Sequence, residues 1–244
     1  MKIAVIGTGL IGGQVVRRLT EAGHEATGHS RATGVDLLTG AGLDDAVSGA
    51  TVVVDVTNSP TFDEASVDFF RTSVTNLLAA AGKAGVRHVV VLSIVGVDRV
   101  PGVAYYRAKT LQEDLVKAGP VPYSIVRATQ FMEFVPTVLD LTTDGDVVRL
   151  PSTPIQPISS AEVAAAVAET AEGAPLRGTR EIAGPEIFPL DELGRITIEA
   201  TGDSRKVVTD DAAGLFSAVE GDVLTASAGA WLAPTHYRDW LRSR

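Results

Sequence analysis

A glycine-rich turn near the N-terminus constrains the fold more than any other feature of this sequence. It separates a strand-like apolar run, residues 3–6, from a helix-like segment, residues 14–22. Gly7 suits a tight strand-to-helix turn, Gly9 opens the main chain to a pyrophosphate, and Gly12 allows close helix packing. The N–H groups that begin the helix attract an anion. We therefore predict a dinucleotide site, with a purely structural tight turn as the alternative. The residues predicted to contact the cofactor here are Gly7, Thr8, Gly9, Leu10, Ile11 and Gly12.

Composition and charge limit the partners of the chain. A net charge of −9 in 244 residues opposes binding to nucleic acid or to an anionic membrane. The absence of cysteine excludes disulfides and thiolate ligands, and the four histidines lack metal-site spacing, so we expect no metal. No segment resembles a targeting sequence. We expect a cytoplasmic protein, either a monomer or a homodimer, with a small-molecule substrate.

The first half of the sequence alternates strand-like and helix-like segments. After the first strand, the pattern predicts strands at residues 24–29, 35–37, 51–56, 87–94 and 123–127, and helices at 63–84 and 104–118. Residues 51–56 are apolar on both faces, which is typical of a central strand in a parallel sheet. Six strands alternating with helices predict an α/β fold with a doubly wound, Rossmann-like parallel sheet.

Beyond Gln130 the pattern is less regular, although a helix at 160–172, a strand at 180–183 and a helix from Leu190 are expected. No flexible linker divides the chain, so we predict a single unit over residues 1–244. Its core is expected to comprise residues 1–130, approximately, together with two later segments that pack back onto it, residues 151–158 and 179–184. The remainder, about 131–244, is expected to form the smaller substrate side.

Tyr105 and Lys109 are candidate catalytic residues because their spacing places both on one face of the predicted helix. An ammonium there lowers the pKa of a phenol, which favours proton transfer near neutral pH. Ser93, at the end of the preceding strand, offers a hydroxyl to orient a substrate carbonyl. The alternative is a solvated lysine beside a packed tyrosine. We interpret adjacent acids such as Glu113 and Asp114 as solvated charges.

Several segments together resemble the short-chain dehydrogenase/reductase superfamily, and most closely its NmrA-like, atypical NAD(P)-binding branch. The matching segments are residues 8–12, 54–57, 76–81, 85–88, the series Tyr105, Lys109 and Glu113, residues 123–131, 156–158 and 162–164. Two departures stand out. The first glycine spacing is one residue shorter than in the branch, and the asparagine that many relatives carry in the middle helix would fall near Phe70.

The resemblance implies roles for individual residues. Asp36 and Leu37 would flank the adenine, and Thr57 and Asn58 would line the ribose and nicotinamide side. Lys109 would bind the nicotinamide ribose, Tyr105 would be the general acid, and Phe131 would wall the nicotinamide.

The end of the second strand indicates which cofactor is preferred. An acidic residue there typically binds the ribose hydroxyls of NAD, but this chain has Ser30 and Arg31 instead. A guanidinium fork and a hydroxyl suit a 2′-phosphate, so we predict NADP(H) over NAD(H), with a solvated loop arginine as the alternative. The resulting hypothesis is an NADPH-dependent oxidoreductase that passes hydride to a small carbonyl, quinone or related acceptor. The alternative is an NADP(H)-binding redox sensor without turnover.

Overall fold

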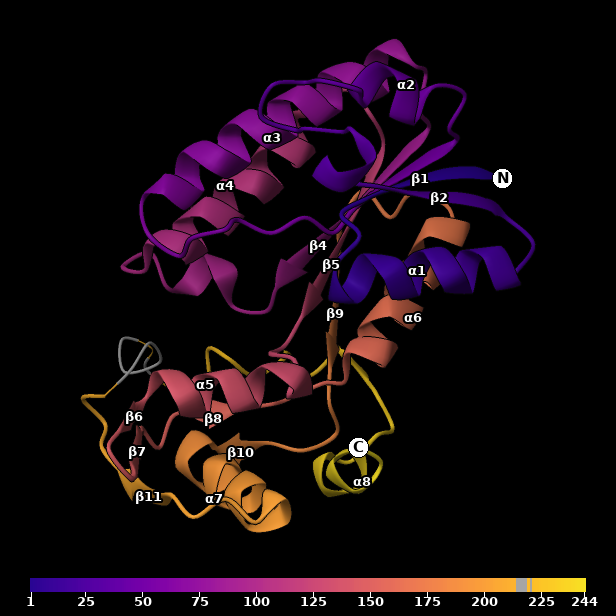
Figure 1. Ribbon diagram of the computed structural model, residues 1–244. Coiled ribbons are helices and arrows are strands. Elements are labelled where there is room, and N and C mark those ends of the chain that lie inside the picture. The colour runs from indigo at the N-terminus through magenta and orange to yellow at the C-terminus, as the bar shows by residue number, and fades with distance from the viewer. Residues whose placement is uncertain (214–218, 220) are drawn as a thin grey trace. The chain divides into compact units, whose positions relative to one another are not determined.

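The computed structural model describes residues 1–213, 219 and 221–244, and it has an α/β architecture (Figure 1). A seven-stranded sheet has the order β12-β9-β5-β4-β3-β1-β2. Its strands are β1 Lys2–Ile6, β2 Glu25–His29, β3 Val52–Asp55, β4 His88–Ile94, β5 Tyr123–Ala128, β9 Thr179–Ala183 and β12 Trp231–Leu232. Strand β1 pairs in parallel with both β2 and β3, so the strand order reverses around β1. The predicted α/β class with a parallel Rossmann-like sheet is confirmed.

The chain divides into two compact units. The first comprises Met1–Arg127 and Ala161–Arg180, and the second comprises Ala128–Ser160 and Glu181–Arg244. Segment 151–158, which was expected to return to the core, thus lies in the second unit.

Helices cover both faces of the sheet within the first unit. The helices are α1 Leu10–Glu21, α2 Leu43–Val47, α3 Ala65–Lys83, α4 Ala104–Ala118 and α6 Ser160–Glu172. Figure 1 shows α3 and α4 side by side on one face and α1 with α6 on the other. Arg18 after the middle of α1 donates to the Ala161 carbonyl (3.1 Å), and His24 contacts Glu172 (2.9 Å). All four residues of β3 are buried, as expected for a central strand.

The predicted strand at residues 35–37 is wrong. These residues follow a short 3₁₀ turn, Arg31–Thr33, and form no strand. Val35 and Leu37 are buried, which explains the strand-like alternation. However, the Asp36 carboxylate accepts the N–H groups of Leu38 (2.7 Å) and Thr39 (3.3 Å). An aspartate that bonds the backbone just ahead of it closes a turn and prevents extended pairing.

The second unit contains short elements. They are α5 Val135–Leu141, β6 Thr143–Asp144, β7 Val147–Leu150, β8 Pro154–Ile155, β10 Phe188–Pro189, α7 Leu190–Thr201, β11 Lys206–Thr209 and α8 Tyr237–Arg242. Strands β11, β7 and β6 form one small sheet, and β10 with β8 forms another. The predicted helix start at Leu190 is confirmed.

Candidate functional site

The glycine turn between β1 and α1 has the backbone geometry that a phosphate cradle requires. Gly7 adopts φ +98°, which disfavours other residues, and its N–H donates to the His29 carbonyl (2.8 Å). A Cβ on Gly12 would lie 1.8 Å from the Gly7 oxygen, so only glycine fits there. Gly9, by contrast, faces open space. No side chain caps the start of α1, and its first turn has no acidic residue. The turn therefore presents free N–H groups to an anion.

The remaining residues of this turn differ in exposure. Thr8, Gly9 and Leu10 are exposed, whereas Ile11 is buried. A Cβ on Gly28 of β2 would lie 3.0 Å from the Thr8 methyl group, so the turn packs against the end of β2.

Ser30, Arg31 and Asp36 lie together after β2. The Arg31 Nε is 3.3 Å from the Asp36 carboxylate, and the Arg31 side chain is 65% exposed. The Ser30 N–H donates to the Thr33 hydroxyl (2.8 Å). Leu37, which was expected beside the adenine, is buried in the hydrophobic core, and its carbonyl accepts the Asn76 amide (2.8 Å). The Arg31 guanidinium is thus accessible to a phosphate, but a phosphate would compete with the Asp36 carboxylate for it.

The turn after β3 carries Thr57 and Asn58. The buried Asp55 carboxylate accepts both the N–H (3.0 Å) and the hydroxyl (2.6 Å) of Thr57. A Cβ on Gly7 would lie 3.3 Å from the Thr57 nitrogen, so this turn lies against the glycine turn. Asn58 is exposed, and its Oδ1 accepts the Tyr105 hydroxyl. Asn58, a predicted cofactor residue, is therefore hydrogen-bonded to Tyr105, the predicted general acid.

Tyr105 and Lys109 share one face of α4, with Phe70 of α3 contacting both. The rings of Phe70 and Tyr105 are 6.3 Å apart, and the Lys109 Nζ lies 4.8 Å from the Phe70 ring centre. Phe62, which is 48% exposed, meets the Tyr105 ring edge-on at 4.9 Å. Beside Tyr105 and Lys109, α3 thus presents an aromatic ring at the position where the resemblance leads one to expect an asparagine.

The predicted effect of Lys109 on Tyr105 is contradicted. Burial raises the pKa of Tyr105 above its usual value, and the hydrogen bond to Asn58 offsets this only in part. The Lys109 ammonium instead donates to the Leu92 carbonyl (2.8 Å) and to Oε1 of Gln112. Burial also lowers the pKa of Lys109 to about 8, against the opposing charges of Asp55 and Glu113. The ammonium is therefore directed toward β3 and β4 rather than toward the phenol.

Ser93 belongs to a second buried network. Its hydroxyl donates to Glu113 Oε1 (2.7 Å), and Arg127 donates to both oxygens of Glu113 (2.8 and 2.7 Å). The interpretation of Glu113 as a solvated acid is wrong, since its side chain is fully buried. Hydrogen bonds from Arg127 and Ser93 outweigh desolvation and lower the pKa of Glu113. The signal that was missed is an arginine near the end of a buried strand, because a buried guanidinium needs an acid as its partner.

Phe131 lies in the second unit. It is half-buried, and its backbone forms a parallel bridge with Ile158. Its expected place beside the nicotinamide stays a prediction.

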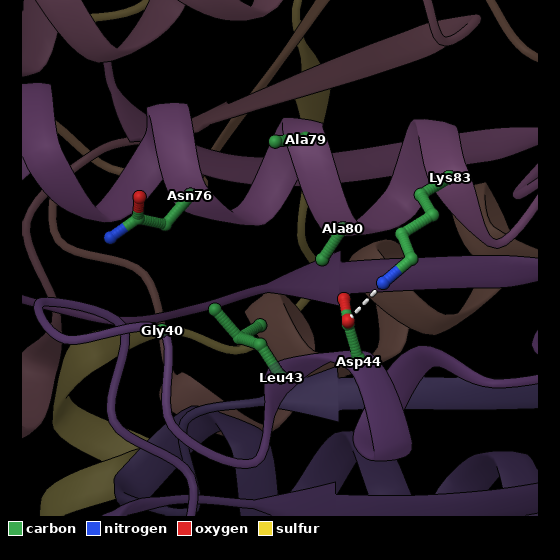
Figure 2. Close-up of a pocket in the computed structure, with 7 residues that line it drawn as sticks. All are labelled: Gly40, Leu43, Asp44, Asn76, Ala79, Ala80 and Lys83. Atoms are coloured by element: carbon green, nitrogen blue, oxygen red, sulfur yellow. Dashed lines mark hydrogen bonds and ion pairs between the residues drawn. The ribbon is translucent and has the colours of Figure 1, made fainter.

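A shallow hollow of about 220 Å³ lies beside the second half of α3 (Figure 2). It is lined by Gly40, Leu43, Asp44, Asn76, Ala79, Ala80 and Lys83. Figure 2 shows the Lys83 ammonium meeting Asp44. None of the predicted site residues lines it. Across the described part of the chain, no group of His, Asp and Glu side chains could hold a metal ion, and no helix is long and apolar enough to cross a membrane.

Comparisons with known proteins agree with this geometry. A family model described as NAD(P)H-binding matches residues 7–173. The (4-alkanoyl-5-oxo-2,5-dihydrofuran-3-yl)methyl phosphate reductase of Streptomyces griseus is 33% identical over 138 residues, which is 51% of this chain and 46% of that protein. The chain thus matches less than half the length of that relative.

Two solved structures share the fold. MoeE5 in complex with UDP-glucuronic acid and NAD has a TM-score of 0.73 at 19% identity, covering 100% of this chain and 97% of the other. The NADPH-dependent quinone oxidoreductase of Escherichia coli, complexed with NADPH, has a TM-score of 0.68 at 20% identity, covering 90% and 84%. At these identities the two structures show the fold, and the resemblance to the short-chain dehydrogenase/reductase superfamily stays a prediction. With most of its length matched by the family model, this chain belongs to the NAD(P)H-binding family.

Proposed function

We propose that this protein is an NADPH-dependent oxidoreductase that passes hydride to a small carbonyl, quinone or related acceptor. The observation that carries the proposal is a closed ring of contacts in the first unit. The backbone at Gly7 lies against that of Thr57. The Asp55 carboxylate accepts hydrogen bonds from Thr57 and Gln112, and Gln112 in turn accepts one from Lys109. Phe70 contacts both Lys109 and Tyr105, and Tyr105 returns to Asn58, the neighbour of Thr57. Candidate cofactor residues and the candidate acid are therefore connected parts of one structure.

The residues present fit a nicotinamide dinucleotide. A side chain is disfavoured at Gly7 and does not fit at Gly12, Gly9 faces open space, and the uncapped start of α1 suits the pyrophosphate. Arg31 would bind the 2′-phosphate of NADP(H), and Lys109 would hold the nicotinamide ribose. When bound, the cofactor supplies the hydride.

Tyr105 would donate the proton to the acceptor oxygen. The phenol is protonated at neutral pH, as a proton donor must be, but burial makes it a weak acid, so its pKa would have to fall when cofactor and acceptor bind. The hydroxyl donates its proton to Asn58 Oδ1, so Tyr105 would have to break this hydrogen bond to donate to the acceptor. Ser93 would orient the acceptor only by turning its hydroxyl away from Glu113.

The test is NADPH consumption across a panel of quinones, ketones and aldehydes, followed by the Tyr105→Phe variant. We expect that variant to lose about two orders of magnitude in turnover while NADPH binding is nearly intact. Tyr123→Phe is the matched control, because it removes a phenol hydroxyl that, among the described residues, donates to the Arg177 carbonyl (3.3 Å) and lies outside the proposed site. Unchanged turnover in Tyr105→Phe would exclude Tyr105 as the acid.

A redox sensor that binds NADP(H) without turnover is the second candidate. The engagement of Ser93 with Glu113 favours it, because a sensor keeps the cofactor site and needs no hydroxyl for an acceptor. Tight NADPH binding without consumption on any acceptor in the panel would support the sensor over the enzyme.

A further inference from the structure

A buried carboxylate, Asp55, lies at the end of β3 beneath the proposed cofactor site. It is 1% exposed, and its Oδ1 accepts two hydrogen bonds from Thr57. Those bonds fix the turn after β3, which lies against Gly7. One oxygen of Asp55 therefore sets the shape of the wall beside the glycine turn.

The second oxygen of Asp55 is tied to α4 through a glutamine. Gln112 is fully buried, and its Nε2 donates to Asp55 Oδ2 (3.2 Å). Its Oε1 accepts the ammonium of Lys109. A carboxamide has a donor and an acceptor at the two ends of one rigid group, so it bridges an anion and a cation that are themselves apart. Two hydrogen bonds thus connect Asp55, Gln112 and Lys109 in a row through the core.

The charges around Lys109 show which buried group balances its ammonium. The groups that face it are Asp55 on β3, Glu113 on α4 and the Phe70 ring on α3. Glu113 is already paired with Arg127 and with Lys117 (2.7 and 3.1 Å). Asp55 is therefore the buried negative charge left to balance the Lys109 ammonium.

We infer that Gln112 is a positioning residue that couples Asp55 to Lys109, and that it holds the ammonium in place for the ribose of the bound cofactor. The part of this inference that concerns the cofactor ribose rests on the proposed function. The coupling between the three side chains concerns the protein alone and is tested without any cofactor.

The experiment follows the titration of Lys109 by NMR with isotope-labelled lysine. The sequence has five lysines, and the signal missing from Lys109→Met identifies the relevant one. Gln112→Leu removes the acceptor, so we expect the titration midpoint to fall by about one pH unit. Gln112→Glu places a carboxylate on the ammonium and should raise the midpoint by about one unit or more. Opposite shifts are not expected from general loosening of the core.

Thr110→Val is the matched control on the same helix. Its hydroxyl contacts the carbonyls of Val97 and Tyr106 and does not touch Lys109, so the midpoint should not move. Equal midpoints in wild type and both Gln112 variants, or shifts of the same sign, would overturn the inference. If Gln112→Glu fails to fold, the fall in Gln112→Leu still decides, because loosening of the core would rehydrate the ammonium and raise the midpoint. If Gln112→Leu fails to fold, Gln112→Met, which also lacks the acceptor, takes its place.

NADPH titration separates this inference from the proposed function. If the midpoints shift as expected but Lys109→Met binds NADPH as tightly as wild type, the coupling stands and the ribose role fails. If Lys109→Met loses affinity while the midpoints do not move, the coupling fails and the proposed function stands.

Discussion

The buried ammonium of Lys109 should make the stability of the protein rise with pH. Its pKa is about 8 in the folded chain, against 10.5 for a solvated lysine, which is the state of the side chain after unfolding. Between those values the unfolded chain binds a proton that the folded chain has released, so unfolding takes up a proton. The free energy of unfolding therefore increases with pH in this window. Integrating the difference from about pH 7 to about pH 9.5 gives about 2 kcal/mol for this single group.

Lys109→Met removes this contribution while keeping a chain of similar length in the core. Urea denaturation of both proteins, followed by circular dichroism at steps of pH, gives the two free energies of unfolding. The wild-type value should gain about 2 kcal/mol relative to the variant across the range. Ionisation of the tyrosines occurs in both proteins and cancels in the difference. Parallel pH profiles would mean that Lys109 titrates near its usual value, and would refute the desolvated ammonium.

The remaining predictions concern Arg31 and Ser93. Arg31→Ala should weaken NADPH binding by about tenfold and leave NADH unchanged, whereas Asp36→Asn releases Arg31 from its ion pair and should strengthen NADPH binding. Equal affinity of the wild type for NADH and NADPH would contradict the 2′-phosphate contact. Ser93→Ala should cost about 1 kcal/mol of stability through the lost bond to Glu113, with turnover unchanged. A large fall in turnover at constant stability would instead assign Ser93 to the acceptor.

The parts of the fold that were predictable from the sequence are those with long, regular periods. The helices predicted at 104–118 and 160–172 begin and end at the observed residues. The error at 35–37 has a local cause, because an aspartate between two buried residues closed a turn. The small sheets of the second unit were not expected, since strands of two to four residues carry little periodic signal.

The candidate site was only partly predictable, for a different reason. The hydrogen-bond partners of a side chain depend on which segments the fold brings close to it. Tyr105 and Lys109 follow from their spacing on a helix, but the partners of each come from other elements: Asn58 from the turn after β3, and Leu92 from β4. Neither pairing leaves a pattern along the chain.

One signal in the sequence does point to the site. Tyr105, Lys109 and Gln112 stand at positions i, i+4 and i+7 of α4, the spacing at which a helix normally presents apolar residues to a core. Polar groups at such positions are unfavourable unless every donor and acceptor finds a partner. The structure supplies those partners through Asp55, Leu92 and Asn58. Because an apolar stripe would pack the same helix without these requirements, stability alone does not account for it, and the polar stripe is best explained by the chemistry proposed for Tyr105 and Lys109.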